Sequence, residues 1–109
     1  MLFQKIFRIR DALLSVTDNV SHYEALNVTN KYCVWAEDTE AASVHADNQK
    51  EVQGIQGTID YFTKEDGDPA VERVQEALDG VEGVVYSLNS VQYEEETGYI
   101  HYEWLWEVS

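Results

Sequence analysis

Three histidines each precede an acidic residue by two positions, a spacing that could place two metal ligands side by side. The pairs are His22 with Glu24, His45 with Asp47, and His101 with Glu103. On a β-strand both members of a pair would share one face, because side chains alternate between the faces. A metal centre needs three or four converging ligands, and no spacing in the sequence brings the pairs together. We therefore expect solvated polar faces here, with no metal and no other cofactor.

A second candidate is Asp66-Gly67-Asp68, which begins like a calcium-binding loop. No glutamate stands at the twelfth position of such a loop, and Pro69 suits the first turn of a helix. We therefore expect a turn and a helix N-cap. The sequence also lacks a glycine-rich phosphate loop, a serine nucleophile elbow and a Cys/His pairing. These absences predict no catalytic residues, and we interpret the chain as a protein that is not an enzyme.

The only cysteine, Cys33, has no partner for an intramolecular disulfide. It lies in the alternating run KYCVWA, which predicts a strand position and not a reactive thiol. The opening run MLFQKIFRIR is too interrupted by charge for a signal peptide, and no stretch of 18 apolar residues occurs. We therefore expect a chain that is neither exported nor membrane-bound.

Charge is the strongest global feature, because 21 acids against 7 bases give a formal net charge of -14. Lys5, Arg8 and Arg10 all precede the first acid, Asp11. Such a surface repels phosphates, so specific nucleic-acid binding and docking on anionic membranes are disfavoured. A plain solubility surface is one interpretation. The functional alternatives are a basic partner, mimicry of DNA, and a wall past which DNA slides without binding.

Helical periodicity occurs in two segments. The first spans about residues 2–16, where an apolar stripe is flanked by a second stripe that widens the apolar arc to about half the circumference, more than one core-facing side requires. The first stripe is Ile6, Ile9, Leu13 and Val16, and the second is Phe3, Phe7 and Leu14, with Arg10 between the two. We expect something besides the core to contact this helix.

The second helix has one narrow apolar stripe and clear end signals. Asp68 is a suitable N-cap, and Gly80 and Gly83 both fit a helix that ends there. The stripe consists of Val71, Val74, Leu78 and Val81. This pattern predicts a simple cover over a sheet.

Periodicity of two predicts strands at 20–25, 31–37, 84–93 and 100–108, with a long third strand at 49–63. Thr97-Gly98 supplies a turn residue that tolerates positive φ, so the last two strands should form an antiparallel hairpin. In 84–93 the alternation places Val85, Val91 and Tyr93 opposite Val84, Tyr86 and Leu88. In the last strand Ile100, Tyr102, Trp104, Trp106 and Val108 face away from His101, Glu103 and Glu107.

These elements predict one domain over residues 1–109 of the α+β class, a mostly antiparallel sheet with two helices packed on one face in the order α-β-β-β-α-β-β. Neither face of 49–63 reads as a simple core face. The strand could extend past the sheet towards a neighbouring subunit, or it could be an edge strand wetted on one side. In the first case its polar side chains would be available for an interface, namely Gln53, Gln56, Thr58 and Asp60.

Three phrases of the sequence resemble small tail-component proteins from Firmicutes prophages: DALLSVTDNVSHYEA, VHADNQKEVQGIQGTIDYFTKEDGDPAVERVQEAL and LNSVQYEEETGYIHYEW. The predicted order of elements is similar to that of the tail terminator, or tail completion, family. The resemblance covers most of the chain from Asp11 to Val108. It implies a structural role without turnover, in the virion tail and, during assembly, in the host cytoplasm.

The resemblance implies a ring of subunits, typically a hexamer, that caps the tail tube protein and docks with the head-tail connector protein. Subunit contacts would then involve Phe3, Phe7, Arg10 and Leu14 on the first helix together with Gln53, Gln56, Thr58 and Asp60. Contacts to the tube or connector would involve Glu94, Glu95, Glu96 and Tyr99. An acidic lumen would let DNA pass without binding.

Two other functions remain open. An acidic inhibitor could mimic DNA and occupy the groove of a basic nucleic-acid-binding protein, using the glutamates at 94–96. A small hydrolase could use the scattered groups Asp60, His101 and Glu103.

Overall fold

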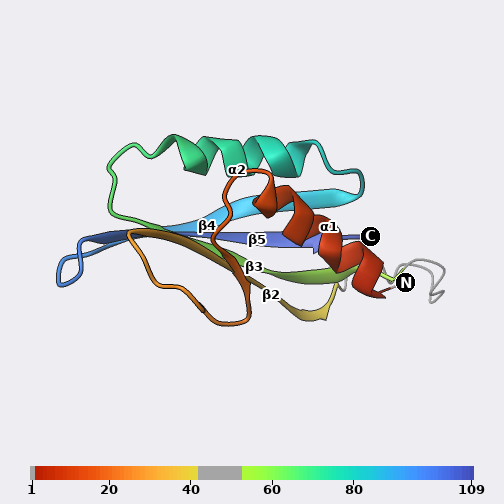
Figure 1. Cartoon of the computed structure of the whole chain (residues 1–109). Coiled ribbons are helices and arrows are strands. Elements are labelled where there is room, and N and C mark those ends of the chain that lie inside the picture. Colours follow the sequence, from red (N-terminus) through yellow and green to blue (C-terminus); the bar gives the residue numbers. More distant parts are fainter. Residues whose placement is uncertain (1, 42–52) are drawn as a thin grey trace.

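A computed structural model describes residues 2–41 and 53–109 of the chain. Two helices and five strands follow one another in the order expected from the sequence, so the predicted α+β class is confirmed (Figure 1). The elements are α1 Leu2–Leu14, β1 Val20–His22, β2 Lys31–Glu40, β3 Ile55–Thr63, α2 Pro69–Asp79, β4 Val84–Glu94 and β5 Tyr99–Val108. Both helices lie on one face of the sheet.

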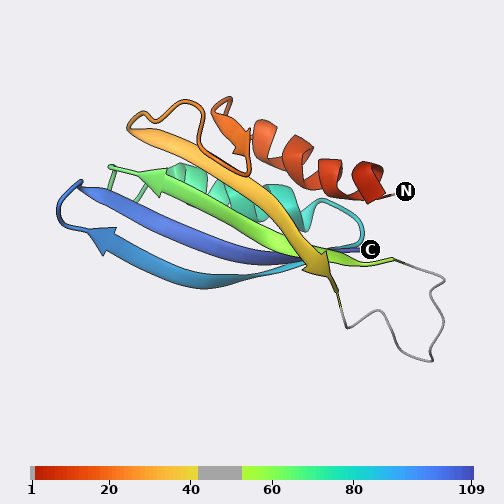
Figure 2. The same ribbon diagram turned by 90° about the horizontal axis from the view of Figure 1, so that it is seen from below.

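The sheet has the strand order β1-β2-β3-β5-β4. The short β1 runs parallel to β2, and all other neighbours are antiparallel. Seen from below, no described helix covers the near face of the strands (Figure 2). The sheet therefore has one face packed on helices and one open face.

The core lies between the helices and the sheet. Ile6, Ile9 and Leu13 of α1 are fully buried, as is Trp104 of β5. The rest of the buried cluster comes from α2 and from strands β2, β3 and β5. It includes Cys33, Trp35, Ile59, Val74, Leu78 and Trp106. Burying one such aliphatic or aromatic side chain stabilises the fold by about 1.5–3 kcal/mol, so hydrophobic burial holds the helices in place.

One glycine in β3 is required by close packing. A Cβ added at Gly57 would lie 2.0 Å from the Ala36 carbonyl oxygen and 2.5 Å from the Trp106 ring. The Trp106 indole N–H donates to the Thr58 carbonyl at 2.9 Å, which fixes the ring over the strand. Glycine is therefore required at position 57, because the Trp106 ring of the neighbouring strand occupies the space that a side chain would need.

The start of α2 is held by a buried carboxylate, as the sequence predicts. Asp68 accepts the Ala70 N–H at 2.9 Å and the Tyr61 hydroxyl at 2.7 Å. Burial alone would raise the pKa of Asp68, but the hydrogen bonds it accepts, first among them that of the Ala70 amide, lower the pKa overall. The helix ends at Gly80, whose N–H bonds back to the last turn.

The interpretation of 49–63 as a projecting or edge strand is wrong. β3 begins at Ile55 and lies between β2 and β5, so it is a central strand. Its residues alternate strictly, and Ile55, Ile59 and Tyr61 face the core. Gln53 lies before the strand, and residues 49–52 are outside the described part of the chain. The strand looked weak because Gly57 occupies a core-facing position.

The element that projects past the helices is the hairpin of β4 and β5 (Figure 1). Gly98 has φ of 80°, as the predicted turn requires. A bulge at Asn89 shifts the register of β4 against β5, so the expected grouping of Val85 with Val91 and Tyr93 is wrong. Val85 lies on the open face, whereas Val91 and Tyr93 lie on the helix side of the projecting hairpin.

Besides the start of β3, three element ends differ from the prediction by two or three residues. α1 stops at Leu14 and not at residue 16, because its last turn tightens through a bond from the Val16 N–H to the Leu13 carbonyl. β1 stops at His22 and not at residue 25, since Tyr23 has a positive φ of 73°. β2 continues to Glu40 through a register shift between residues 37 and 39.

Candidate functional site

The open face is formed by every second residue of the two central strands and their cross-strand neighbours. Residues directly opposite in an antiparallel pair share a face, so the register between β3 and β5 defines its centre. The central pairs are Gln56 with Glu107, Thr58 with Leu105, Asp60 with Glu103, and Phe62 with His101. Two of these four pairs contain a carboxylate, and aromatic rings cluster at one end.

The aromatic cluster lies at the end of the open face near the hairpin. The Phe62 ring stacks between Tyr32, at 4.6 Å between centroids, and His101, at 4.2 Å. Tyr99 packs edge-on against both Tyr32 and Phe62, and its hydroxyl donates to the Thr29 carbonyl. Each aromatic pair adds about 0.5–1.5 kcal/mol beyond the area it buries, so these contacts stabilise this end of the sheet.

Polar side chains lie in the middle of the open face. The His101 Nε2 atom is 2.7 Å from Asp60 Oδ1, and the Asn89 amide donates to Glu103 Oε1 at 2.7 Å. Burial raises the pKa of Asp60, and the Glu103 carboxylate opposite raises it further, although His101 partly offsets both. The pair of carboxylates therefore favours the approach of a cation or a positively charged side chain.

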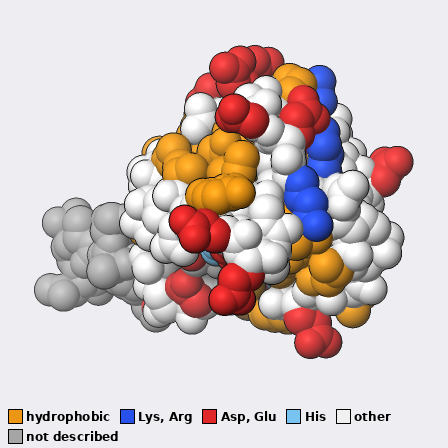
Figure 3. All heavy atoms as spheres, turned by 90° about the vertical axis from the view of Figure 1, so that its left-hand side faces the viewer, with side chains coloured by type: hydrophobic (Ala, Val, Ile, Leu, Met, Phe, Trp, Pro, Cys, Tyr) orange, Lys and Arg blue, Asp and Glu red, His pale blue; other side chains and the backbone are white. Residues whose placement is uncertain are grey.

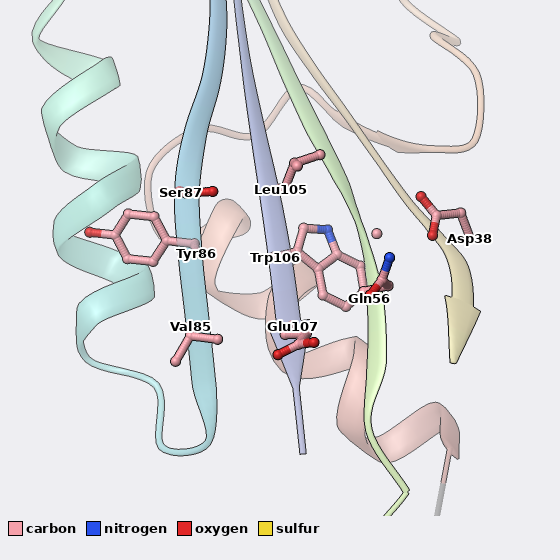
Figure 4. Close-up of a pocket in the computed structure, with 9 residues that line it drawn as sticks. Asp38, Gln56, Val85, Tyr86, Ser87, Leu105, Trp106 and Glu107 are labelled. Carbon is pink, nitrogen blue, oxygen red and sulfur yellow. The ribbon is translucent and has the colours of Figure 1, made fainter. Parts of the chain in front are cut away.

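A hollow of about 280 Å³ lies at the other end of the open face (Figure 4). Val85 and Leu105 line it with their side chains 62% and 43% exposed. The polar lining includes Asp38 of β2, Gln56 of β3 and Glu107 of β5. Exposed aliphatic side chains beside carboxylates suit a contact surface better than a reaction centre.

The expected first-helix residues lie on the opposite side of the sheet from the open face. Phe3 and Leu14 are exposed to 63% and 44%. Phe7 stacks on Phe3 at 6.0 Å and packs edge-on against Trp35 at 6.5 Å. The Arg10 guanidinium lies 4.2 Å from the centre of the Phe7 ring. We call these four α1 residues, Phe3, Phe7, Arg10 and Leu14, the α1 stripe.

The hairpin tip carries the acidic residues expected to contact a tube or connector. Glu95 and Glu96 are exposed, while the Glu94 carboxylate accepts the Thr97 hydroxyl at 3.1 Å. Tyr99 lies directly opposite Glu94 in the hairpin, but its ring packs into the aromatic cluster. From the projecting end, hydrophobic and acidic side chains share the surface (Figure 3). The apolar part includes Val91 and Tyr93, exposed to 51% and 65%.

The histidines pair differently from the sequence spacing. His22 lies 2.7 Å from Glu37 and stacks on Tyr23 and Trp35, so its expected grouping with Glu24 is wrong. His101 does share the open face with Glu103, but its direct partner is Asp60. His45 and Asp47 lie outside the described residues.

No group of three potential metal ligands occurs within residues 2–41 and 53–109. Cys33 is fully buried, and burial raises the pKa of its thiol to about 12, which makes it unreactive at neutral pH. Asp68 is fully used as an N-cap and a partner of Tyr61, so the segment that begins like a calcium loop is a turn and cap.

Of the residues expected at subunit contacts, the structure brings Gln56, Thr58 and Asp60 together on the open face. Gln53 lies apart from them, where its carbonyl accepts a hydrogen bond from Lys5 at 2.6 Å. Sequence reasoning missed Val85 and Leu105. The alternation around Leu105 could have revealed it, whereas the bulge in β4 concealed Val85.

Comparison with protein-family models and with curated proteins finds no match. Among the residues that the structure describes, no helix has the length and apolar character needed to cross a membrane.

Proposed function

We propose that this chain is a structural subunit of a phage tail, a ring-forming terminator that caps the tail tube and joins it to the head connector. The observation that carries the proposal is the open face: a broad sheet surface that no described helix covers and that exposes aliphatic side chains between carboxylates. An antiparallel sheet can leave one face in water, but that face is then usually polar, whereas Val85 and Leu105 are exposed on this one. An assembly subunit keeps it for contact with other chains.

The resemblance of three sequence phrases to prophage tail proteins supports the same role. The order α-β-β-β-α-β-β agrees with the order that the resemblance implies. The described part of the chain also offers large exposed side chains on two opposite sides, the α1 stripe and the open face. A subunit with two neighbours in a ring needs two such surfaces.

The charge of the chain fits a channel that conducts DNA. With a net charge of -14, a ring of several copies would repel the phosphate backbone at any surface that lines its lumen. The glutamates at 94–96 lie at the hairpin tip, where the exposed Glu95 and Glu96 are available to a tube or connector protein. Non-specific attraction of passing DNA would be weak for the same reason.

The proposal is tested by electron microscopy of tails assembled with and without the chain. Without it, we expect tubes of uncontrolled length that fail to join heads, and adding the purified chain should restore a uniform length. Tails of normal length that still join heads in its absence would exclude the terminator role. The matched control is a chain with Glu76→Lys, because Glu76 is an exposed acid on α2 far from both surfaces.

A second candidate is an acidic inhibitor that mimics DNA. It is favoured by one observation, the run of three glutamates at the end of a projecting hairpin. This function predicts tight, salt-sensitive binding to a basic nucleic-acid-binding enzyme, with fast association at low salt. Charge reversal at Glu94, Glu95 and Glu96 should abolish that binding, whereas the same number of reversals on α2 should leave most of it.

A further inference from the structure

The two surfaces that face away from the core lie on opposite sides of the molecule and differ in charge. Among the described helices and strands, α1 alone has a net positive charge, from Lys5, Arg8 and Arg10 against Asp11. The open face carries Asp60, Glu94, Glu103 and Glu107 on its strands, and no Lys or Arg occupies its described strand positions. The chain therefore has a basic helix with exposed apolar residues on one side of the sheet and an acidic face with exposed apolar residues on the other.

From this arrangement we infer that two copies of the chain associate head to tail, with the α1 stripe of one copy seated on the open face of the next. The inference builds on the ring-forming role proposed above and names its contact. Arg10 would approach the carboxylates of Asp60 and Glu103, and Phe3 and Leu14 would cover the exposed Leu105 and its surroundings.

Charge disfavours the two symmetric alternatives. Two open faces brought together would oppose their carboxylates, and two α1 helices would oppose their basic residues, so both contacts are repulsive in an interface from which water is excluded. Only the pairing of unlike faces removes exposed apolar surface and matches charge at the same time. A contact between different surfaces repeats from copy to copy, and it closes into a ring where the rotation allows.

The availability of Arg10 fits this contact. Its guanidinium pairs with the neighbouring Asp11 at 3.0 Å in an exposed position, and it lies over the Phe7 ring. Arg8, by contrast, is tied to the Glu82 and Ser109 carbonyls at 2.7 and 3.0 Å and so holds the fold. Exposed ion pairs are worth little, so Arg10 can change partners at low cost.

The test uses two variants of the full chain, each with one broken surface. Arg10→Glu reverses the charge of the α1 stripe, and Leu105→Lys places a cation in the open face. Arg73→Glu on α2 and Leu88→Lys on β4 are matched controls, because both sites are exposed and lie off the two surfaces; Leu88 is 46% exposed against 43% for Leu105. Circular dichroism first establishes that all four variants fold.

Sedimentation velocity up to millimolar concentration then gives the association of each sample. We expect the wild-type chain and both controls to associate, with weakening as salt increases. Each broken variant should associate at least about tenfold more weakly, the effect typical of a central contact residue. An equimolar mixture of the two broken variants should recover pairs but no larger species, because one intact stripe meets one intact open face.

A mixture that stays monomeric, or a wild-type chain that stays monomeric throughout, would overturn the inference. Its failure is separable from that of the tail role. Recovered pairs together with normal tails in the absence of the chain would keep the contact and reject the terminator. A monomeric mixture together with overlong tails would reject the contact and keep the terminator role.

Discussion

The two helices lie on the same face of one sheet, yet they differ in what they present to solvent. α2 turns Glu72, Arg73 and Glu76 outward and buries a narrow stripe, so the core accounts for every apolar residue it has. α1 buries an equally good stripe and still exposes Phe3 and Leu14. A helix that only covers a sheet has no use for a second apolar stripe. Under the proposal made above, this second stripe of α1 serves a contact with another copy of the chain.

The helices also differ in how their ends are held. The N-terminus of α2 is fixed by Asp68, a buried carboxylate with several donors. α1 is tied at its flank by long side chains, since Arg8 and Lys5 donate to backbone carbonyls far away in the sequence. Both helices depend on packing against the sheet, but only α2 has in addition a local cap at its N-terminus.

The largest expected effect is a loss of stability when a buried leucine is removed from either helix, because both helices pack against the same core. Leu13→Ala in α1 and Leu78→Ala in α2 each remove a fully buried side chain. We expect each to lower the free energy of unfolding by about 2–5 kcal/mol, because a cavity remains where the side chain was. Urea denaturation followed by tryptophan fluorescence measures both. A loss in α1 of well under 1 kcal/mol would show that α1 is not packed as described.

The next largest effect is a loss of stability at the N-terminus of α2 that has no counterpart at the N-terminus of α1. Asp68→Ala removes the N-cap of α2, worth about 0.5–2 kcal/mol, and leaves the Tyr61 hydroxyl without its acceptor, worth about 1–3 kcal/mol. Thermal and urea unfolding should show the combined loss. Gln4→Ala in the first turn of α1 is the control, because Gln4 is exposed and its replacement should change stability by under about 0.5 kcal/mol. Equal losses at both sites would refute the contrast.

The Asp68 contribution should also depend on pH. Its pKa is lowered in the folded chain, so its charged form adds stability above the unfolded pKa of about 3.9, and this stability is lost as pH falls through the folded value. Asp68→Asn keeps a capping side chain but removes the charge. The stability difference between wild type and this variant should be full near neutral pH and should vanish in acid. A difference that stays constant from pH 7 to strong acid would mean that the charge contributes nothing.

Local signals in the sequence were sufficient for much of this fold. Asp68 followed by Pro69 fixes the start of α2 through neighbours only, and the alternation around Trp104 and Trp106 identifies both faces of β5. Those features depend on residues within a few positions of one another. The class and element order follow from them.

Features that depend on residues far apart in the sequence could not be predicted from local patterns. Gly57 looked like a weakness in its strand, but its reason is Trp106, nearly fifty positions later. The central place of β3 depends on which strands pair, and the bulge at Asn89 depends on the register with β5. His22 likewise pairs with Glu37 across the sheet and not with its sequence neighbour. The sequence therefore predicted only part of the open face: it identified Gln56, Thr58 and Asp60 but missed Val85 and Leu105.

The smallest expected effect on stability is also the most direct test of the contrast between the helices. Leu14→Gln on the α1 stripe replaces an exposed side chain by one of similar helix propensity, so the free energy of unfolding of the monomer should change by less than about 0.5 kcal/mol. Association at high protein concentration should nevertheless weaken, because Leu14 no longer covers the open face of a second copy. Val71→Gln on α2 is the opposite case: Val71 packs partly against the core, so its loss should lower stability and leave association unchanged once the fold is intact. Sedimentation velocity measures the association of the two variants, and urea unfolding measures their free energies of unfolding. If Leu14→Gln destabilises the monomer as much as Val71→Gln does, the second stripe of α1 serves the core and not a partner.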